Sequence, residues 1–206
     1  MSGWLTTHGA SSGIRATIAF ASRAIASLGI DRASSIPALT FAVVAGGAAA
    51  IAATERIGSW WWLPALLLWA ITLSTAAACD AHTQRIPTAL LRVGGSATLL
   101  LVVLAVLATE DWRALGVTLV ACVAACAVLA ACWRFGGMGF GDVRLSAVGG
   151  LGLGHTTYRS LVLGLFVFVA VTLCQAAWTF ARTRNRYALF AYGPALALAF
   201  LVAAAT

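Results

Sequence analysis

The sequence predicts an all-α protein, a polytopic membrane helix bundle of six to seven transmembrane segments. Of its 206 residues, 62% are hydrophobic and 9% are charged, whereas about 25% of the residues in a soluble domain are charged. Mean hydropathy is +0.96. Apolar runs close to the length that crosses the hydrocarbon core of a bilayer recur along the chain. The composition therefore excludes a soluble domain and makes the lipid bilayer a partner of the whole chain.

Breaks between the apolar runs divide the chain into predicted segments. The expected spans are residues 36–53, 60–79, 88–108, 114–133, 143–154, 160–181 and 188–205. Trp60, Trp61 and Trp62 open the second span as an interfacial anchor. Glycines interrupt 143–154, so it either crosses the membrane or is partly unwound against its neighbours.

The residues before the first span are more polar. Residues 1–35 are expected to form a polar or amphipathic cytoplasmic leader, and residues 36–206 form the membrane domain. Within the leader, 14–30 has apolar residues at roughly helical spacing with arginines between them, a pattern typical of a helix on the membrane surface. Whether 14–30 inserts or only contacts the membrane stays open at this point.

The basic residues predict the orientation in the membrane. All 13 are arginines, and they lie at the ends of apolar runs rather than in a patch, so no nucleic acid is expected as a partner. If the N-terminus and the connector after Asp80 are cytoplasmic and the segments alternate, only Arg56, Arg113 and Arg159 fall outside. This arrangement obeys the positive-inside rule and brings Asp80 and Asp142 to the same cytoplasmic side.

The five cysteines do not predict a metal centre. They lie within or at the ends of apolar runs, none forms a Cys-x-x-Cys pair, and no histidine stands near them at ligand spacing. We interpret them as small buried hydrophobic residues and expect neither a metal nor another cofactor. They are Cys79, Cys122, Cys126, Cys132 and Cys174.

Two of the six acidic residues are candidates for catalysis. Asp80 ends the second apolar run, and Asp142 follows a glycine-rich stretch between two others. An ionisable side chain at membrane depth is costly and marks a functional site. Two carboxylates in a low-dielectric site share one proton, so one can act as base on water while the other donates to a carbonyl oxygen. Glycines without side chains leave room for an extended peptide along the backbone.

Short motifs around these residues resemble one peptidase family. Gly139-Phe-Gly141-Asp142 matches the Gly-x-Gly-Asp signature of intramembrane aspartic proteases, and Gly137 to Leu145 is similar to the prepilin peptidase (type IV leader peptidase) family. Asp80 with Arg85-Ile86-Pro87 resembles the first aspartate motif of that family, with Thr88 where asparagine is common. Arg144 replaces the usual lysine. Tyr192-Gly193-Pro194 resembles its C-terminal element, with Ala191 replacing a proline.

The resemblance, which covers roughly 60–205, implies an aspartic endopeptidase at the cytoplasmic face of the bacterial inner membrane. Its substrates would be type IV prepilins or pseudopilins, recognised through the leader peptide and the hydrophobic helix that follows it. Asp80 and Asp142 would be the catalytic pair. The chain resembles the short form of the family, without the cytoplasmic domain associated with methylation, so methylation is not expected.

Other residues near the motifs are expected to bind substrate or shape the site. They are Gly137, Met138, Gly139, Gly141, Arg85, Pro87, Arg144, Gly193 and Pro194. Structural roles compete with this interpretation. Asp142 could simply cap a helix, Asp80 could pair with Arg85, and the arginines could anchor the membrane edge. A proton-coupled transporter and an inactive peptidase-like factor in pilus assembly are the alternative functions.

Overall fold

The computed structural model describes residues 32–136, 138–184 and 191–206, and these residues contain helices and no strand. The predicted surface segment 14–30 lies outside them. The helices from Pro37 onward form one compact unit. In chain order the elements are α2 (Arg32–Ile57), the 3-10 helix η1 (Trp60–Trp62), α3 (Leu63–Thr83), α4 (Thr88–Thr109), α5 (Trp112–Gly136), α6 (Phe140–Gly150), α7 (Tyr158–Thr183) and α8 (Gly193–Ala205).

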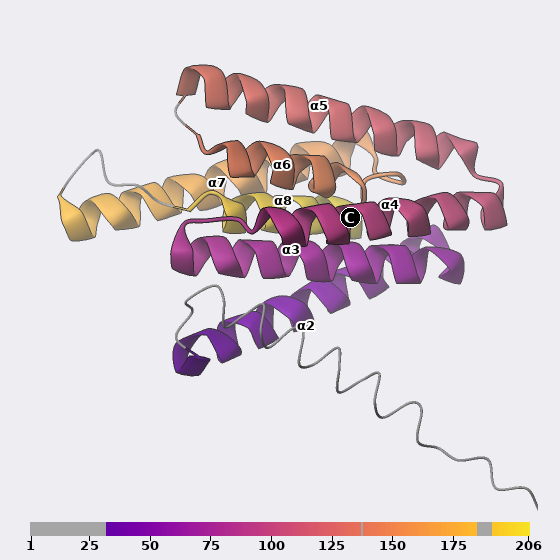
Figure 1. Ribbon diagram of the computed structural model, residues 1–206. Helices are drawn as coiled ribbons and strands as arrows, with labels where there is room; N and C mark the ends of the chain where they lie inside the picture. The colour runs from indigo at the N-terminus through magenta and orange to yellow at the C-terminus, as the bar shows by residue number, and fades with distance from the viewer. Residues whose placement is uncertain (1–31, 137, 185–190) are drawn as a thin grey trace, which may run out of the picture. The chain divides into compact units, whose positions relative to one another are not determined.

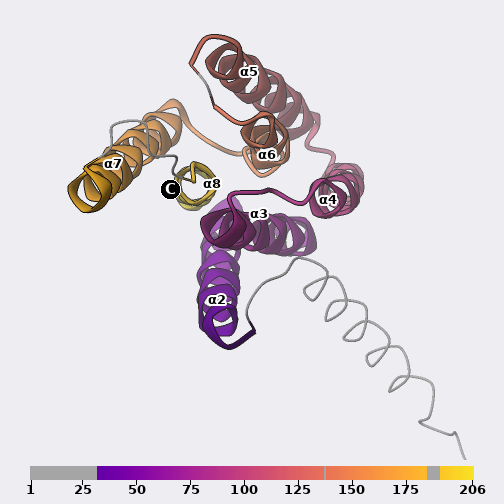
Figure 2. The same ribbon diagram turned by 60° about the vertical axis from the view of Figure 1, so that its left-hand side comes forward.

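Helix α3 is central in the bundle (Figure 1). It packs against α4, α6 and α8, while α5 packs on α6 and α7 packs on α8. The view in Figure 2 shows the same two outer pairs, α5 with α6 and α7 with α8. The buried side chains of α3 are mostly alanine, leucine and small polar residues, and small side chains allow helices to approach closely.

The all-α membrane fold predicted from the sequence is confirmed. Among the described helices, four are long and apolar enough to cross a membrane: Trp60–Thr83, Thr88–Thr109, Trp112–Phe135 and Tyr158–Thr183. Large apolar side chains remain exposed on α5 and α7. A soluble protein rarely leaves such continuous apolar surface open to water, so these faces are the ones that lipid covers.

Two predicted spans are shorter helices in the structure. The segment predicted at 143–154 is α6, which has 11 residues, begins at Phe140 and ends at Gly150. The segment predicted at 188–205 is α8, which has 13 residues and begins at Gly193. At about 1.5 Å per residue, they measure about 16 Å and about 20 Å, well short of the roughly 30 Å hydrocarbon core. Pro194 lies in the first turn of α8, where its missing N–H costs no hydrogen bond.

The cysteines are only partly in the predicted environment. All five thiols are free, but Cys79 alone is buried; Cys122, Cys126 and Cys132 are half-buried, and Cys174 is exposed. Cys174 lies on the apolar outer helix α7. A thiol behaves as a small hydrophobic group, so lipid satisfies it as well as a protein core does.

Close packing of α6 depends on glycine. A Cβ atom added at Gly150 would lie 2.5 Å from Cα and 2.6 Å from the backbone nitrogen of Cys122 in α5. Backbone cannot move aside as the end of a flexible side chain can. Gly149 and Gly152 are similarly close to the rings of Phe200 and Trp69. The indole N–H of Trp69 also donates to the carbonyl oxygen of Val148 at 2.9 Å, which ties α3 to the end of α6.

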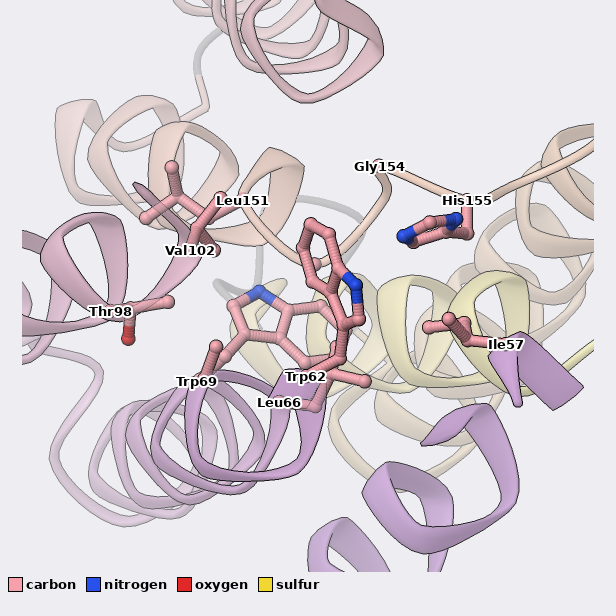
Figure 3. A pocket seen from close by; sticks show the side chains of 11 residues that line it. Ile57, Trp62, Leu66, Trp69, Thr98, Val102, Leu151, Gly154 and His155 are labelled. Atoms are coloured by element: carbon pink, nitrogen blue, oxygen red, sulfur yellow. The ribbon is translucent and has the colours of Figure 1, made fainter. Parts of the chain in front are cut away.

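A small enclosed cavity lies beside this contact (Figure 3). Trp62, Trp69 and His155 are among the residues that line it, and its volume is about 10 Å³. That is room for about one water molecule, so it is too small for a substrate. The imidazole of His155 packs edge-on against Trp62 with ring centroids 4.5 Å apart and lies 3.7 Å from a carboxylate oxygen of Asp111.

We predict that Gly150→Ala destabilises the protein by about 1–3 kcal/mol, because the added methyl group overpacks the contact between α5 and α6. Gly116→Ala is the matched control, since a Cβ at this exposed helical position meets nothing within 4 Å. Alanine there should stabilise the protein by up to about 1 kcal/mol. Thermal unfolding in detergent, followed by tryptophan fluorescence, measures both changes. Equal effects of the two substitutions would contradict the packing described.

His155 should make stability depend on pH. Burial lowers the pKa of His155, partly opposed by the charge of Asp111, while Arg56 lowers it further. Because the pKa is lower in the folded state, the neutral form favours folding, and this contribution is lost as pH falls below the unfolded value of 6.5. We predict that Tm falls less between about pH 7.5 and about pH 5 in His155→Gln than in the wild type. Parallel pH profiles for the two proteins would exclude this role.

Candidate active site

Asp80 lies in the last turn of α3 and is buried. The helix ends at Thr83 because the next residue, Gln84, adopts a left-handed conformation with φ of 52°. In this conformation the backbone N–H of Gln84 donates to the carbonyl oxygen of Asp80 at 2.8 Å, which closes the helix end. The hydroxyl of Thr83 donates to the carbonyl oxygen of Cys79 at 2.8 Å. The carbonyl oxygens of Cys79 and Asp80 therefore both accept hydrogen bonds at the helix end. The side chain of Asp80 is buried in the bundle.

The first residue of α8 holds the carboxylate of Asp80. The backbone N–H of Gly193 donates to Oδ2 of Asp80 at 2.8 Å, a buried hydrogen bond between residues 113 positions apart. The free N–H groups and the partial positive charge at a helix N-terminus favour a carboxylate there. A Cβ at Gly193 would lie 2.6 Å from the same oxygen. Glycine is thus required for this approach.

Asp142 comes from the first turn of α6, three residues after the N-cap Gly139. Its side chain is buried, and its backbone N–H donates to the carbonyl oxygen of Gly139 at 3.1 Å. Asp142 is not the N-cap residue of α6, as the structural alternative would require, because Gly139 occupies that position. Burial, reinforced by the charge of Asp80, raises the pKa of Asp142 to about 6, and a contact with the backbone of Gly139 partly opposes this shift.

Both aspartates line one cavity of about 520 Å³. Figure 1 shows why they meet: α3 ends, and α4, α6 and α8 begin, at the same end of the bundle. Predicted site residues that line the cavity with them are Arg85, Gly139, Gly141 and Arg144. The volume lies within the 300–1,000 Å³ range of ligand pockets, so a short peptide segment can enter it.

The two arginines make the rim of the cavity basic. Arg85 lies exposed in the connector between α3 and α4, and Arg144 is exposed on α6. One guanidinium nitrogen of Arg144 donates to the hydroxyl of Thr88 at 2.9 Å, and the guanidinium lies 4.8 Å from the centre of the Phe140 ring. Neither arginine pairs with Asp80 among the contacts of the described residues, so the alternative role of Asp80 as a partner of Arg85 is not seen.

Other predicted site residues lie outside the cavity lining. Met138 is partly buried and packs against the hydrophobic core. Pro87 is the N-cap residue of α4, and Pro194 lies in the first turn of α8, so both act on the position of helix ends. Gly137 lies outside the described residues.

Five residues that line the cavity were not among the predicted site residues: Gln84, Ile86, Phe140, Ala191 and Tyr192. Tyr192 precedes Gly193 directly, so its position in the C-terminal motif was a signal for it. Burial raises the pKa of the Tyr192 hydroxyl, and the charge of Asp142 adds to the shift. Ile86 packs on Gly141, where an added Cβ would be 3.4 Å away. Nothing in the local sequence of Ile86 indicates this contact.

The arrangement supports acid–base chemistry on a bound molecule. Both buried carboxyl groups line one cavity, and the charge of Asp80 adds to the raised pKa of Asp142. One ionised and one protonated carboxyl group can activate water and polarise a carbonyl group together. Gly139 and Gly141 line the cavity beside Asp142 and, without side chains, leave space there for a bound molecule.

Comparison with protein families gives one match. The model of the type IV leader peptidase family matches residues 65–180, more than half of the chain. Both aspartates lie within the matched range, whereas α8 follows it. Searches of curated proteins and of solved structures gave no match. On the extent of the family match, this multi-pass helical membrane protein belongs to the type IV leader peptidase family.

Proposed function

We propose that this protein is an aspartic endopeptidase that removes the N-terminal leader of type IV prepilins or pseudopilins. The observation that carries the proposal is the meeting of Asp80 and Asp142, 62 positions apart in the sequence, on one cavity at one end of the bundle. Membership in a peptidase family supports the reaction class. The leader peptide and the hydrophobic helix after it are the proposed partners.

In this mechanism the two carboxyl groups share one proton. The ionised group takes a proton from a water molecule, which attacks the carbonyl carbon of the scissile peptide bond. The protonated group donates its proton to the carbonyl oxygen, which gives a tetrahedral intermediate. The first group then returns the proton taken from water to the leaving nitrogen as the C–N bond breaks, and a hydroxyl of the intermediate gives its proton to the second group, which restores the pair. Gly193 stabilises the ionised form of Asp80 through its backbone N–H, whereas the burial of Asp142 favours the protonated form.

The backbone around Asp142 provides room for the substrate. Gly139 is exposed and Gly141 is half-buried, and both line the cavity. An extended peptide could therefore lie against them and pair with backbone groups. The arginine distribution in the sequence supports a cytoplasmic position for this end of the bundle, in the bacterial inner membrane, where a leader that has not crossed the membrane is accessible.

We predict that Asp80→Asn and Asp142→Asn each reduce cleavage of a prepilin by at least about 100-fold, because asparagine can neither take nor donate the shared proton. Glu55→Gln, an exposed acidic position at the end of α2, is the control and should cleave normally. Cleavage is measured as the shift of a co-expressed prepilin on gels, with Tm verifying that each variant folds.

Two outcomes would contradict the proposal. Cleavage by both asparagine variants would exclude the two-aspartate mechanism. A folded wild-type protein that cuts no prepilin would favour a proton-coupled transporter or an inactive assembly factor instead, and proton flux in proteoliposomes would separate these two.

We predict that Gly193→Ala lowers kcat by about 10- to 100-fold, since displacing a catalytic group by about 1 Å has effects of this size. The added methyl group would meet Oδ2 of Asp80 at 2.6 Å and push either the carboxylate or the start of α8 away. Gly116→Ala, which meets no neighbour, should retain wild-type kcat. A variant at Gly193 with unchanged kcat would show that the hydrogen bond to Asp80 does not position it for the reaction.

A further inference from the structure

A second cavity opens beside the candidate active site, between α4 and α6. Its volume is about 440 Å³, and its lining is Thr88, Leu91, Arg92, Arg144, Ala147 and Val148. We call this cavity the arginine groove. The two helices approach closely along it, because a Cβ at Gly95 of α4 would meet the side chain of Val148 at 2.9 Å. Arg144 borders both the groove and the aspartate cavity.

The groove has two cations and no anion. Arg92 and Arg144 are exposed, and neither forms an ion pair with a carboxylate in the described part of the chain, where the single ion pair joins His155 to Asp111. Thr88 and the ring of Phe140 hold the guanidinium of Arg144 in place, yet only one of its five N–H donors is used in these contacts. The other four N–H donors of Arg144 and the guanidinium group of Arg92 remain available for a ligand.

The groove is also amphipathic and lies along a helix that can cross the membrane. Leu91, Ala147 and Val148 form its apolar wall. Helix α4 is one of the four described helices that are long and apolar enough to cross a membrane. Leu99 lies two turns after Arg92 on the same face of α4 and is 40% exposed. A ligand that fits must therefore have an anionic group beside hydrocarbon. Basic pockets between transmembrane helices bind lipid headgroups by this combination.

We propose that the arginine groove binds an anionic phospholipid. Its phosphate would lie between Arg92 and Arg144, where guanidinium groups can form paired hydrogen bonds with phosphate oxygens. The hydroxyl of Thr88 borders the same space, and the acyl chains would run along the apolar wall and past Leu99 of α4. The proposal concerns binding alone and does not require that the protein is a peptidase.

The test measures lipid binding to the purified full-length protein by native mass spectrometry. Phosphatidylglycerol is titrated against phosphatidylcholine with the same acyl chains, and inorganic phosphate is added as a competitor. The variants are Arg92→Gln, Arg144→Gln and the double substitution. Arg182→Gln is the matched control, because Arg182 stacks on Trp178 within α7, which packs on α8 rather than on α4 or α6.

We expect the wild type to prefer phosphatidylglycerol. Arg92→Gln should weaken that affinity about fivefold, and the double substitution about 25-fold, as the loss of one and two arginines at a membrane surface implies. Arg182→Gln and binding of phosphatidylcholine should be unchanged, with Tm verifying that all variants fold.

Several results would overturn the proposal. One is a double variant that binds phosphatidylglycerol within about twofold of the wild type, which is less than the loss of one arginine implies. Another is an equal loss of affinity in Arg182→Gln, which would indicate a general charge effect. Displacement of the lipid by inorganic phosphate at comparable concentration would make the groove a site for free anions instead.

Discussion

The hydrogen bond from the backbone N–H of Gly193 to Asp80 is the contact on which the candidate site depends. It joins the end of α3 to the start of α8 and gives a buried carboxylate a donor and a helix N-terminus. A buried charge that loses its partner costs several kcal/mol, so the two helix ends must stay together if Asp80 is to ionise. Helix α8 starts at this carboxylate, with its first residue buried in the bundle.

Close packing holds α6, and with it Asp142, in position. Two of its glycines let the backbone of α5 and the ring of Phe200 come nearer than any side chain would allow, and Gly152, just after the helix, does the same for the ring of Trp69. In lipid, where no hydrophobic effect drives helices together, such close contact is a main source of stability. The helix can therefore be short and still be firmly held, and Asp142 in its first turn lines the same cavity as Asp80.

Arg144 connects two features at this end of the bundle. Its side chain lines the aspartate cavity on one side and the arginine groove on the other, while Thr88 and Phe140 fix its guanidinium. An anion bound in the groove would reduce the positive potential at the cavity, where a carboxylate pair is sensitive to nearby charge. Binding of the proposed phospholipid would therefore act on the protonation of the aspartates through this one side chain.

The sequence by itself determined the membrane fold, the order of the helices and the residues with unusual chemistry, because hydropathy and isolated charges are local properties. It also indicated Asp80, Asp142 and the Tyr192-Gly193-Pro194 element. Only the tertiary structure decided that α6 and α8 are too short to cross, that Gly193 binds Asp80, and that Ile86, Tyr192 and Arg92 line cavities. These features depend on contacts between helices distant in the chain, which local pattern does not specify. A helix stops early in a membrane only where neighbouring helices satisfy its end, and that is decided in three dimensions.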